Sequence, residues 1–331
     1  MRHGSYDLDP DARVNWRVLK VLWPYLWEYR GRILIALGFL VASKGAILVI
    51  PFVLKRLVDS LNATDGVQVA MTVLIVMVIG YGLARFSNVL FGELRDTVFG
   101  RVTERAMHRI GLQVFRHLHS LDLAFHVDRQ TGGLARDVER GITGVSFLLR
   151  FFVFNIAPTL FEISMVVGIL LVKYGWPFAT ITLVAVIAYA GFSVRATEWR
   201  TRFVRDANEA DSASNTRAVD SLLNFETVKY FTNEAFEAER YDRELEKWEI
   251  ARRRNRLSLF TLNGGQALII AVAQTSMIGL AAVRVRNGDM SLGDFILVNQ
   301  FMIQLFMPLG FLGFVYREIR GSMANIERLF D

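Results

Sequence analysis

Long apolar runs alternate with charged segments along this chain. A helix rises about 1.5 Å per residue, so roughly 20 residues cross a hydrocarbon core of about 30 Å. Six runs of about that length contain at most one charged residue: Ile33–Leu54, Gly66–Ala84, Phe151–Val172, Trp176–Val194, Leu257–Val283 and Phe295–Tyr316. Backbone amides in lipid must bond within their own segment. The pattern therefore predicts six transmembrane helices and an all-α membrane protein.

The connections between these runs differ in length and charge. Val58–Gln68, between the first two runs, contains no Lys or Arg, and only Lys173–Gly175 separates the third run from the fourth. The second-to-third and fourth-to-fifth connections are long and rich in arginine. The positive-inside rule predicts that both long connections and both termini are cytoplasmic. Arg284 and Arg286, in the fifth-to-sixth turn, run against the rule but are heavily outnumbered.

The long connections have the pattern of helices. Apolar residues recur at helical spacing from Arg85 to Leu121 without a proline, and Arg195–Leu223 and Phe236–Leu257 are amphipathic with few breakers. About 35 such residues extend a helix some 50 Å beyond the membrane. Short inner turns near Asp128–Gly133 and Leu222–Glu234 then close the extended pairs. Two separate soluble helical hairpins are the alternative.

The N-terminal segment, residues 1–30, is expected to precede a six-helix domain at 31–331. Trp16–Trp27 mixes aromatic and basic residues, which suits an interfacial helix along the headgroups. Met1–Arg13 contains three Asp and no apolar core, unlike a secretory signal or a mitochondrial presequence. This start favours a bacterial inner membrane over a mitochondrial one.

Composition narrows the function classes. The chain is 53% hydrophobic with a mean hydropathy of +0.32, and its net charge of +6 resides between the apolar runs. That placement favours contact with anionic lipid over nucleic acid. The absence of cysteine excludes disulfides, thiolate catalysis and cysteine metal clusters. No Gly-Lys phosphate loop occurs, and Leu262–Gln266 matches a nucleotide-binding signature in all but one letter yet lies inside an uncharged run. We predict no catalytic residue, and the histidine spacing does not favour a metal site.

Several motifs together resemble a known family. They are the first inner turn Phe125–Leu134 with Arg136 and Glu139–Gly141, the second inner turn Asn224–Glu234, and Tyr316–Arg320. With six long helices they resemble the transmembrane domain of ABC exporters (type I exporters, or type IV), over essentially the whole chain. The second turn resembles the mitochondrial and heavy-metal-tolerance type, whose bacterial relatives export glutathione species.

The resemblance implies the membrane half of a half-transporter that works as a homodimer. A nucleotide-binding domain would follow Asp331 and would bind ATP and magnesium, so no cofactor is expected in this chain and ATPase activity only with that domain. The inner turns would be coupling helices resting on it, through Phe125, Arg129, Gly132, Phe225, Glu226, Val228, Lys229 and Tyr230. Independently, exposed apolar residues at the second tip favour a partner surface over a turn that merely closes the hairpin.

Polar residues within the runs suggest a substrate site, because such groups usually face a cavity or a partner helix. Arginines beside amides suit a ligand with carboxylates and peptide groups, such as glutathione. The resemblance implies a glutathione pocket of Tyr189, Arg200, Asn263, Gln266, Gly313 and Arg317. One family arginine is replaced by Val204, for which Arg202 or Arg205 would have to substitute. Interhelical hydrogen bonding is the alternative role for Asn263 and Gln266, and Lys44 and Glu162 are expected to pair helices or line a cavity.

Two other functions stay open from the sequence. A lipid or drug exporter of the same fold would have a mostly apolar cavity, indifferent to loss of Arg200 or Arg317. A channel or membrane scaffold would need no ATP-driven partner, although no run carries a regular ring of charge or a filter motif.

Overall fold

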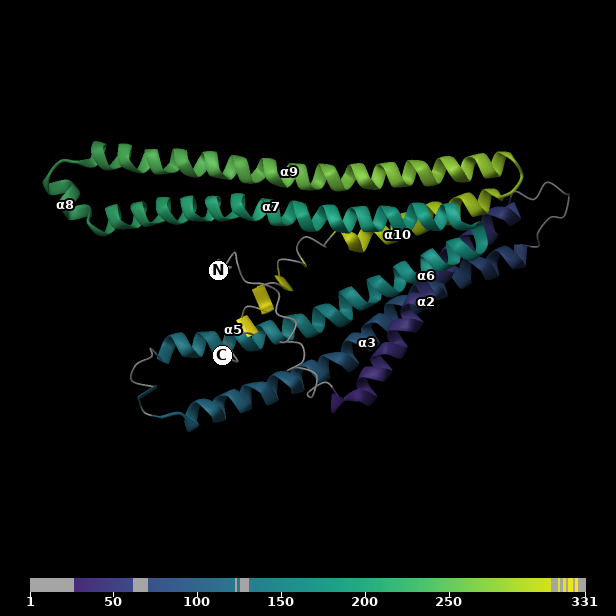
Figure 1. The fold of residues 1–331 in the computed structure, drawn as a ribbon, viewed down its shortest axis with the longest axis horizontal. Coiled ribbons are helices and arrows are strands. Elements are labelled where there is room, and N and C mark those ends of the chain that lie inside the picture. Colours follow the sequence, from purple (N-terminus) through teal and green to yellow (C-terminus); the bar gives the residue numbers. More distant parts are fainter. Residues whose placement is uncertain are drawn as a thin grey trace. The chain divides into compact units, whose positions relative to one another are not determined.

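The fold is a set of long helices. The computed structural model describes residues 27–61, 71–122, 124–125 and 131–310, and then 315, 318–319, 321–323 and 325–326. Within these ranges the chain is helical and has no strand, which confirms the all-α prediction. The order is α2 (Arg30–Leu61), α3 (Met71–Ser120), α5 (Thr131–Phe151), the π-helical segment η1 (Phe152–Ile156), α6 (Ala157–Tyr174), α7 (Trp176–Leu223), α8 (Phe225–Tyr230), α9 (Glu234–Arg286) and α10 (Leu292–Leu309) (Figure 1).

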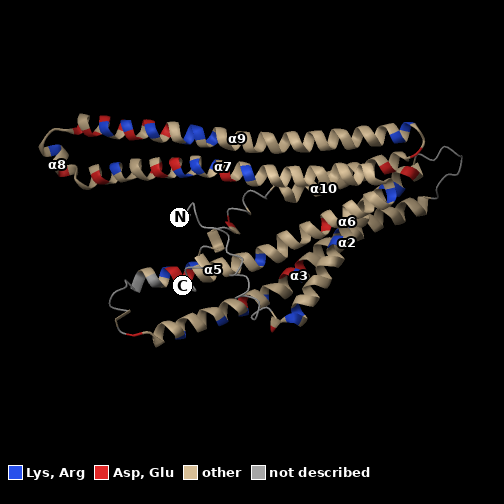
Figure 2. Ribbon diagram, viewed as in Figure 1, with Lys and Arg blue, Asp and Glu red and all other residues tan. Residues whose placement is uncertain are grey.

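Six helical stretches in the described chain are long and apolar enough to cross a membrane, as predicted. The third combines most of α5 with η1 and α6, from Ala135 to Tyr174. The predicted extensions are also confirmed: α3, α7 and α9 have 50, 48 and 53 residues, far more than a bilayer requires. Figure 2 shows that charged residues gather on the α8-side halves of α7 and α9, while the other halves are nearly free of them.

Two compact units divide the chain. One is Ala185–Val272, which contains α8 and the adjoining parts of α7 and α9. The other contains the described residues up to Val184 and from Ala273 onward, and so α2, α3, α5, α6 and α10. The contacts below lie within one unit or the other.

The core of the second unit forms where α2, α3 and α5 meet. Its buried residues are Ala36, Phe99, Ala106, Ile110, Val145, Leu148, Leu149, Met323 and Ile326. Phe99 packs edge-on against Phe154 of η1, with ring centroids 5.5 Å apart. A Cβ on Gly144 would come within 2.9 Å of the Ser322 carbonyl oxygen. Glycine at this position therefore lets α5 approach the backbone of the C-terminal segment closely.

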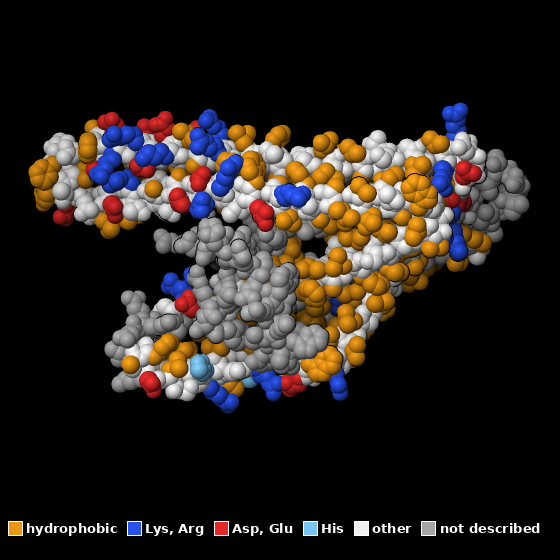
Figure 3. All heavy atoms as spheres, in the orientation of Figure 1, with side chains coloured by type: hydrophobic (Ala, Val, Ile, Leu, Met, Phe, Trp, Pro, Cys, Tyr) orange, Lys and Arg blue, Asp and Glu red, His pale blue; other side chains and the backbone are white. Residues whose placement is uncertain are grey.

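Large apolar side chains remain exposed on the membrane-spanning parts, notably along α3 at Ile75, Val76, Ile79 and Leu83. Figure 3 shows hydrophobic side chains spread over these surfaces, and charged ones crowded on the α8 end of the α7–α9 hairpin. So much exposed apolar area is unusual for a protein surrounded by water. It is the expected surface of helices that face lipid, and the chain is a multi-pass membrane protein.

Candidate functional site

A polar seam runs between α7 and α9 in the unit Ala185–Val272. On α7, Tyr189, Ser193 and Thr197 are four residues apart, so they share one helix face, and all three are buried. Gln266 of α9 donates from Nε2 to Ser193 Oγ at 2.8 Å. Ser258, two turns from Gln266 on α9, is also buried. The seam is a row of hydroxyl and amide groups within the apolar parts of two antiparallel helices.

At its α8-side end the seam carries a charge. Arg200 of α7 donates from Nη2 to Asn255 Oδ1 of α9 at 3.1 Å. Val204, one turn further along α7, is half-buried and adds no charge. Arg202 and Arg205, the possible substitutes for the family arginine, are both exposed, which directs neither into the seam. Arg200 is thus the guanidinium that the structure places at this end of the seam.

The other predicted pocket residues are placed differently. Tyr189 is buried on α7, whereas Asn263 is exposed although it lies only three residues from Gln266. Gly313 and Arg317 lie outside the described residues. The structure therefore brings Tyr189, Arg200 and Gln266 to one helix pair, and their predicted role in binding substrate stays a prediction.

Gly265 has a packing role. A Cβ at this position would lie 2.1 Å from Phe192 Cζ, so only glycine admits the phenyl ring against α9. The group that approaches the α9 backbone here is therefore a side chain of α7. The whole Leu262–Gln266 motif lies inside α9, as expected of a chance match to a nucleotide signature.

Four of the seven residues of the seam were not predicted from the sequence: Ser193, Thr197, Asn255 and Ser258. Small hydroxyl residues are common in membrane helices, where they pair helices. Their spacing could have indicated them: Ser193 and Thr197 are four residues apart on α7, and Asn255 and Ser258 are three apart on α9, so each pair shares a helix face. In this arrangement Gln266 and Arg200 both bond across the helix pair. For Gln266 this is the alternative role foreseen from the sequence, whereas the bond of Arg200 to Asn255 was not foreseen.

Inside the second unit, a charged group bridges three helices. Lys44 of α2 lies 2.5 Å from Glu162 Oε2 of α6, and Gln304 of α10 donates from Nε2 to Glu162 Oε1 at 2.6 Å. Glu162 is only 2% exposed. Buried carboxylates are costly unless they are paired and hydrogen-bonded, and both conditions are met here. Lys44 and Glu162 thus pair helices, as the sequence analysis expected.

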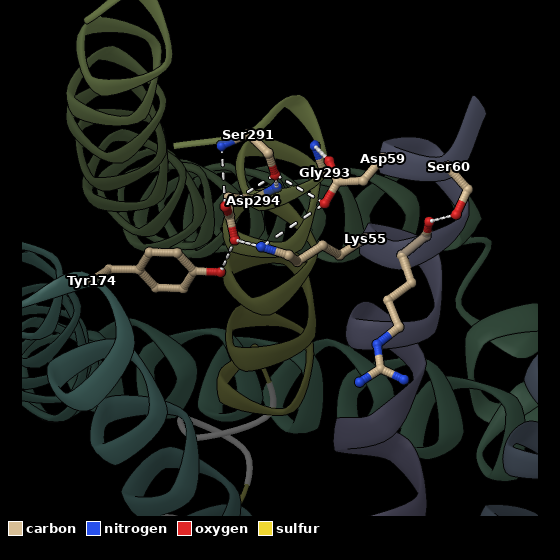
Figure 4. A network of polar contacts seen from close by, with 8 residues as sticks. Lys55, Asp59, Ser60, Tyr174, Ser291, Gly293 and Asp294 are labelled. Atoms are coloured by element: carbon tan, nitrogen blue, oxygen red, sulfur yellow. Dashed lines mark hydrogen bonds and ion pairs between the residues drawn. The ribbon is translucent and has the colours of Figure 1, made fainter. Parts of the chain in front are cut away.

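A larger cluster joins the ends of α2, α6 and α10 (Figure 4). Asp294 forms an ion pair with Lys55 and accepts a hydrogen bond from Tyr174 Oη at 2.5 Å. Asp59 accepts from the Gly293 backbone N–H at 2.9 Å and from Ser291 Oγ at 3.0 Å. Ser291 and Asp294 also form the capping box that begins α10. The first turn of α10 is therefore held by side chains from two other helices.

At the tip of α7 and α9, α8 is a short helix at the place predicted for the second coupling helix, and its coupling role stays a prediction. Phe225 and Glu226 begin this helix, Tyr230 ends it with its ring 82% exposed, and Val228 is half-buried. Lys229 pairs with Glu234 at 2.7 Å, which ties α8 to the start of α9.

The first inner turn is described only at its borders. Phe125 is half-buried and precedes residues outside the described ranges, among them Arg129. Gly132 falls within α5, but its surroundings are not described.

These features define a class of protein. Six membrane-spanning stretches, helices that continue far past their apolar parts, and a short exposed helix at the tip of one extended pair are the architecture of a transporter transmembrane domain. A model of the family "ABC transporter transmembrane region" matches residues 33–309. The chain belongs to this family.

Individual relatives agree with this assignment. The mitochondrial "Iron-sulfur clusters transporter atm1" of Neurospora crassa is 43% identical over 96% of this chain and 46% of its own length. The human mitochondrial "Iron-sulfur clusters transporter ABCB7" is 41% identical over 97% of this chain and 44% of its own. A solved structure of a bacterial Atm1-family ABC exporter with ATP bound matches with a TM-score of 0.67 and 38% identity, over 91% of this chain and 53% of that one. The chain spans about half the length of these relatives, and the family resemblance seen in the motifs is confirmed.

Proposed function

We propose that this chain is the membrane half of an ATP-driven, homodimeric exporter of the Atm1 type. The observation that carries the proposal is the combination of the family match with the exposed aromatic surface of α8 at the tip of two long helices. A stiff helix pair can transmit a rigid-body movement from a nucleotide-binding domain at its tip to the membrane. The relatives' greater length leaves room for that domain, on which α8 would rest.

For the cargo we propose a glutathione-related anion: glutathione, its oxidised form, or a metal or iron–sulfur species that glutathione carries. The mitochondrial relatives are named as transporters of iron–sulfur clusters, and Arg200 beside Asn255 offers a guanidinium and an amide to a ligand with carboxylates. Tyr189 and Gln266 would complete this side of the pocket. Because Arg200 is engaged by Asn255, cargo binding would exchange a bond between helices for one to the ligand.

The cargo proposal is tested by binding to the purified chain. Reduced, oxidised and metal-conjugated glutathione would be titrated against the wild type and Arg200→Ala. Arg240→Ala is the matched control, since Arg240 is an α9 arginine paired with Glu237 far from the seam. We expect Arg200→Ala to weaken binding at least tenfold and the control to leave it unchanged. Equal affinity of all three proteins would refute the role of Arg200, and no binding of any glutathione species by the wild type would favour a lipid or drug exporter.

The ATP-driven mechanism needs a separate test. With a nucleotide-binding domain joined after Asp331, the protein in proteoliposomes should hydrolyse ATP faster when cargo is present, whereas the chain alone should show no hydrolysis. Steady cation conductance by the isolated chain in planar bilayers would instead support the channel hypothesis. The relatives include mitochondrial and bacterial proteins, so they do not favour the bacterial inner membrane over the mitochondrial one.

A further inference from the structure

A band of arginines encircles α7 and α9 where their apolar parts end. We call the following six residues the arginine belt: Arg202, Arg205, Arg252, Arg253, Arg254 and Arg256. All six side chains are exposed, and the segments 199–205 and 252–256 contain no acidic residue; Arg205 alone has an acidic partner in the next turn, Glu209 at 3.9 Å. We propose that the arginine belt is a binding site for the phosphate groups of anionic phospholipids in the adjoining leaflet.

Three hydrogen bonds fix the register of the two helices and place the belt at one level. Gln266 bonds Ser193, Arg200 bonds Asn255, and Trp248 Nε1 donates to Asp211 Oδ1 at 2.7 Å. Because the helices are antiparallel, this register sets the belt residues of α7 beside those of α9. The positive charge therefore forms a single layer across both helices.

The arginine belt lies directly beside exposed apolar side chains of the kind that face lipid. Immediately after the belt, α9 continues with Leu257 and Phe260, whose side chains are 60% and 74% exposed. Trp199 is likewise an exposed aromatic side chain on α7 at this level. Tryptophan is enriched where the apolar and polar parts of a membrane meet, so the belt lies at headgroup depth.

The distribution of charge along the α7–α9 hairpin distinguishes the arginine belt from an ordinary solvated surface. Residues 206–251, which lie beyond the belt toward and around α8, contain 12 acidic and 5 basic residues, a net charge of −7. If the charges served only to keep the helix pair soluble, basic and acidic residues would not need to be separated along it. Figure 2 shows basic residues where the apolar half of α9 begins and mixed charges further toward α8.

Two arginines of the belt are held by aromatic rings. The Arg202 guanidinium carbon lies 4.6 Å from the centre of the Phe203 ring and 5.5 Å from that of Trp199. The Arg252 guanidinium carbon lies 4.9 Å from the centre of the Trp248 ring. Stacking occupies the face of a guanidinium, whereas a phosphate binds its N–H edge bidentately. The rings thus orient both arginines without competing with a phosphate.

A groove between the helices lies at the border of the belt, on its α8 side. It is lined by Phe203, Ile250 and Ala251, with Lys247 and Arg254 as cations and Asp206 as the one acidic group. Arg254 thus belongs both to the belt and to this groove, so the polar headgroup of a lipid bound at the belt would meet the groove, while its acyl chains would extend along the apolar halves of the helices.

Native mass spectrometry of the full chain, released from nanodiscs of phosphatidylglycerol and phosphatidylcholine, tests the proposal. We expect wild type to retain phosphatidylglycerol preferentially. Each basic residue near an anionic surface contributes about a fivefold change in affinity, so Arg202→Gln with Arg252→Gln should weaken retention about 30-fold. The matched control, Arg240→Gln with Arg243→Gln, removes two α9 arginines outside the belt and should retain wild-type binding.

Two outcomes would overturn the proposal: equal retention by the belt and control variants, or displacement of the lipid by an equal concentration of soluble glycerol phosphate, which would indicate a site for free phosphate. If the Arg202/Arg252 variant does not fold, Arg253→Gln with Arg256→Gln removes belt charge without disturbing the stacked rings, and the same loss is expected. Because the readout is lipid retention, it is independent of the cargo and of ATP hydrolysis.

Discussion

Replacing Glu162 with leucine should destabilise the protein severely, and the structure indicates by how much. The carboxylate is 2% exposed and accepts from Lys44 at 2.5 Å and from Gln304 at 2.6 Å. Removing one partner of a buried ion pair costs about 3–5 kcal/mol, because the other charge stays buried without compensation. The Lys44 side chain is only 19% exposed, so its charge would stay largely buried without a partner. We therefore expect a loss of about 3–5 kcal/mol.

A double-mutant cycle separates this effect from simple loss of packing. Lys44→Met combined with Glu162→Leu removes both charges and replaces them with apolar groups of similar size, which is often nearly neutral for a buried pair. The free energy of unfolding would be measured by tryptophan fluorescence in mixed micelles of a mild detergent and dodecyl sulfate. Arg240→Gln serves as the exposed-pair control and should cost less than about 0.5 kcal/mol.

The cycle has a clear failing outcome. If Glu162→Leu alone were neutral, or if the double variant lost as much stability as the single variants Lys44→Met and Glu162→Leu added together, Lys44 and Glu162 would not be coupled. The bridge between α2, α6 and α10 would then owe its stability to packing alone. A coupling energy near 3 kcal/mol supports the electrostatic account.

Three other changes give measurable outcomes. Gly265→Ala places a Cβ against the Phe192 ring and should cost about 1–3 kcal/mol of unfolding free energy; Phe192→Leu in the same chain should restore most of it. Asp294→Ala removes an α10 capping group and the partner of a lysine, and should lower the melting temperature more than Asp294→Asn; equal losses would contradict the capping role. Serine at both Phe225 and Tyr230 should leave the melting temperature unchanged, because both rings are exposed, yet should abolish cargo-stimulated ATP hydrolysis once a nucleotide-binding domain is joined.

The features predicted best from the sequence are those that the bilayer itself determines, namely the length and apolarity of each spanning helix. Length and apolarity are properties of a single segment, so the six spanning stretches and the extensions of α3, α7 and α9 could be predicted from the pattern alone. The exposed aromatic tip at α8 could also be predicted, because apolar residues at a polar turn stand out without any knowledge of packing.

The polar clusters could not be predicted, because they depend on which helix faces meet. Asp59 lay in a segment assigned to the first outer loop, yet α2 continues to Leu61. Lys55 forms an ion pair with Asp294, and Asp59 accepts a hydrogen bond from the Gly293 backbone, both in the first turn of α10. Because these charged side chains are paired, α2 can continue through them. Similarly, the hydrogen bond of Ser193 to Gln266 depends on the antiparallel register of α7 and α9, which the sequence does not give.

The continuity of α9 connects α8, the arginine belt and the seam to one another. One continuous helix of 53 residues begins beside α8 with acidic residues, passes through the arginine belt, and then carries the amides of the seam. A helix without a break transmits displacement along its length, so movement at α8 must reach Asn255 and Gln266 together with the belt. If anionic lipid fixes the belt at the membrane surface, that level resists vertical displacement more than the tip does. The helix pair would then tilt about the headgroup layer, and a small swing of α8 would change the spacing of the seam that Arg200 and Gln266 now hold closed.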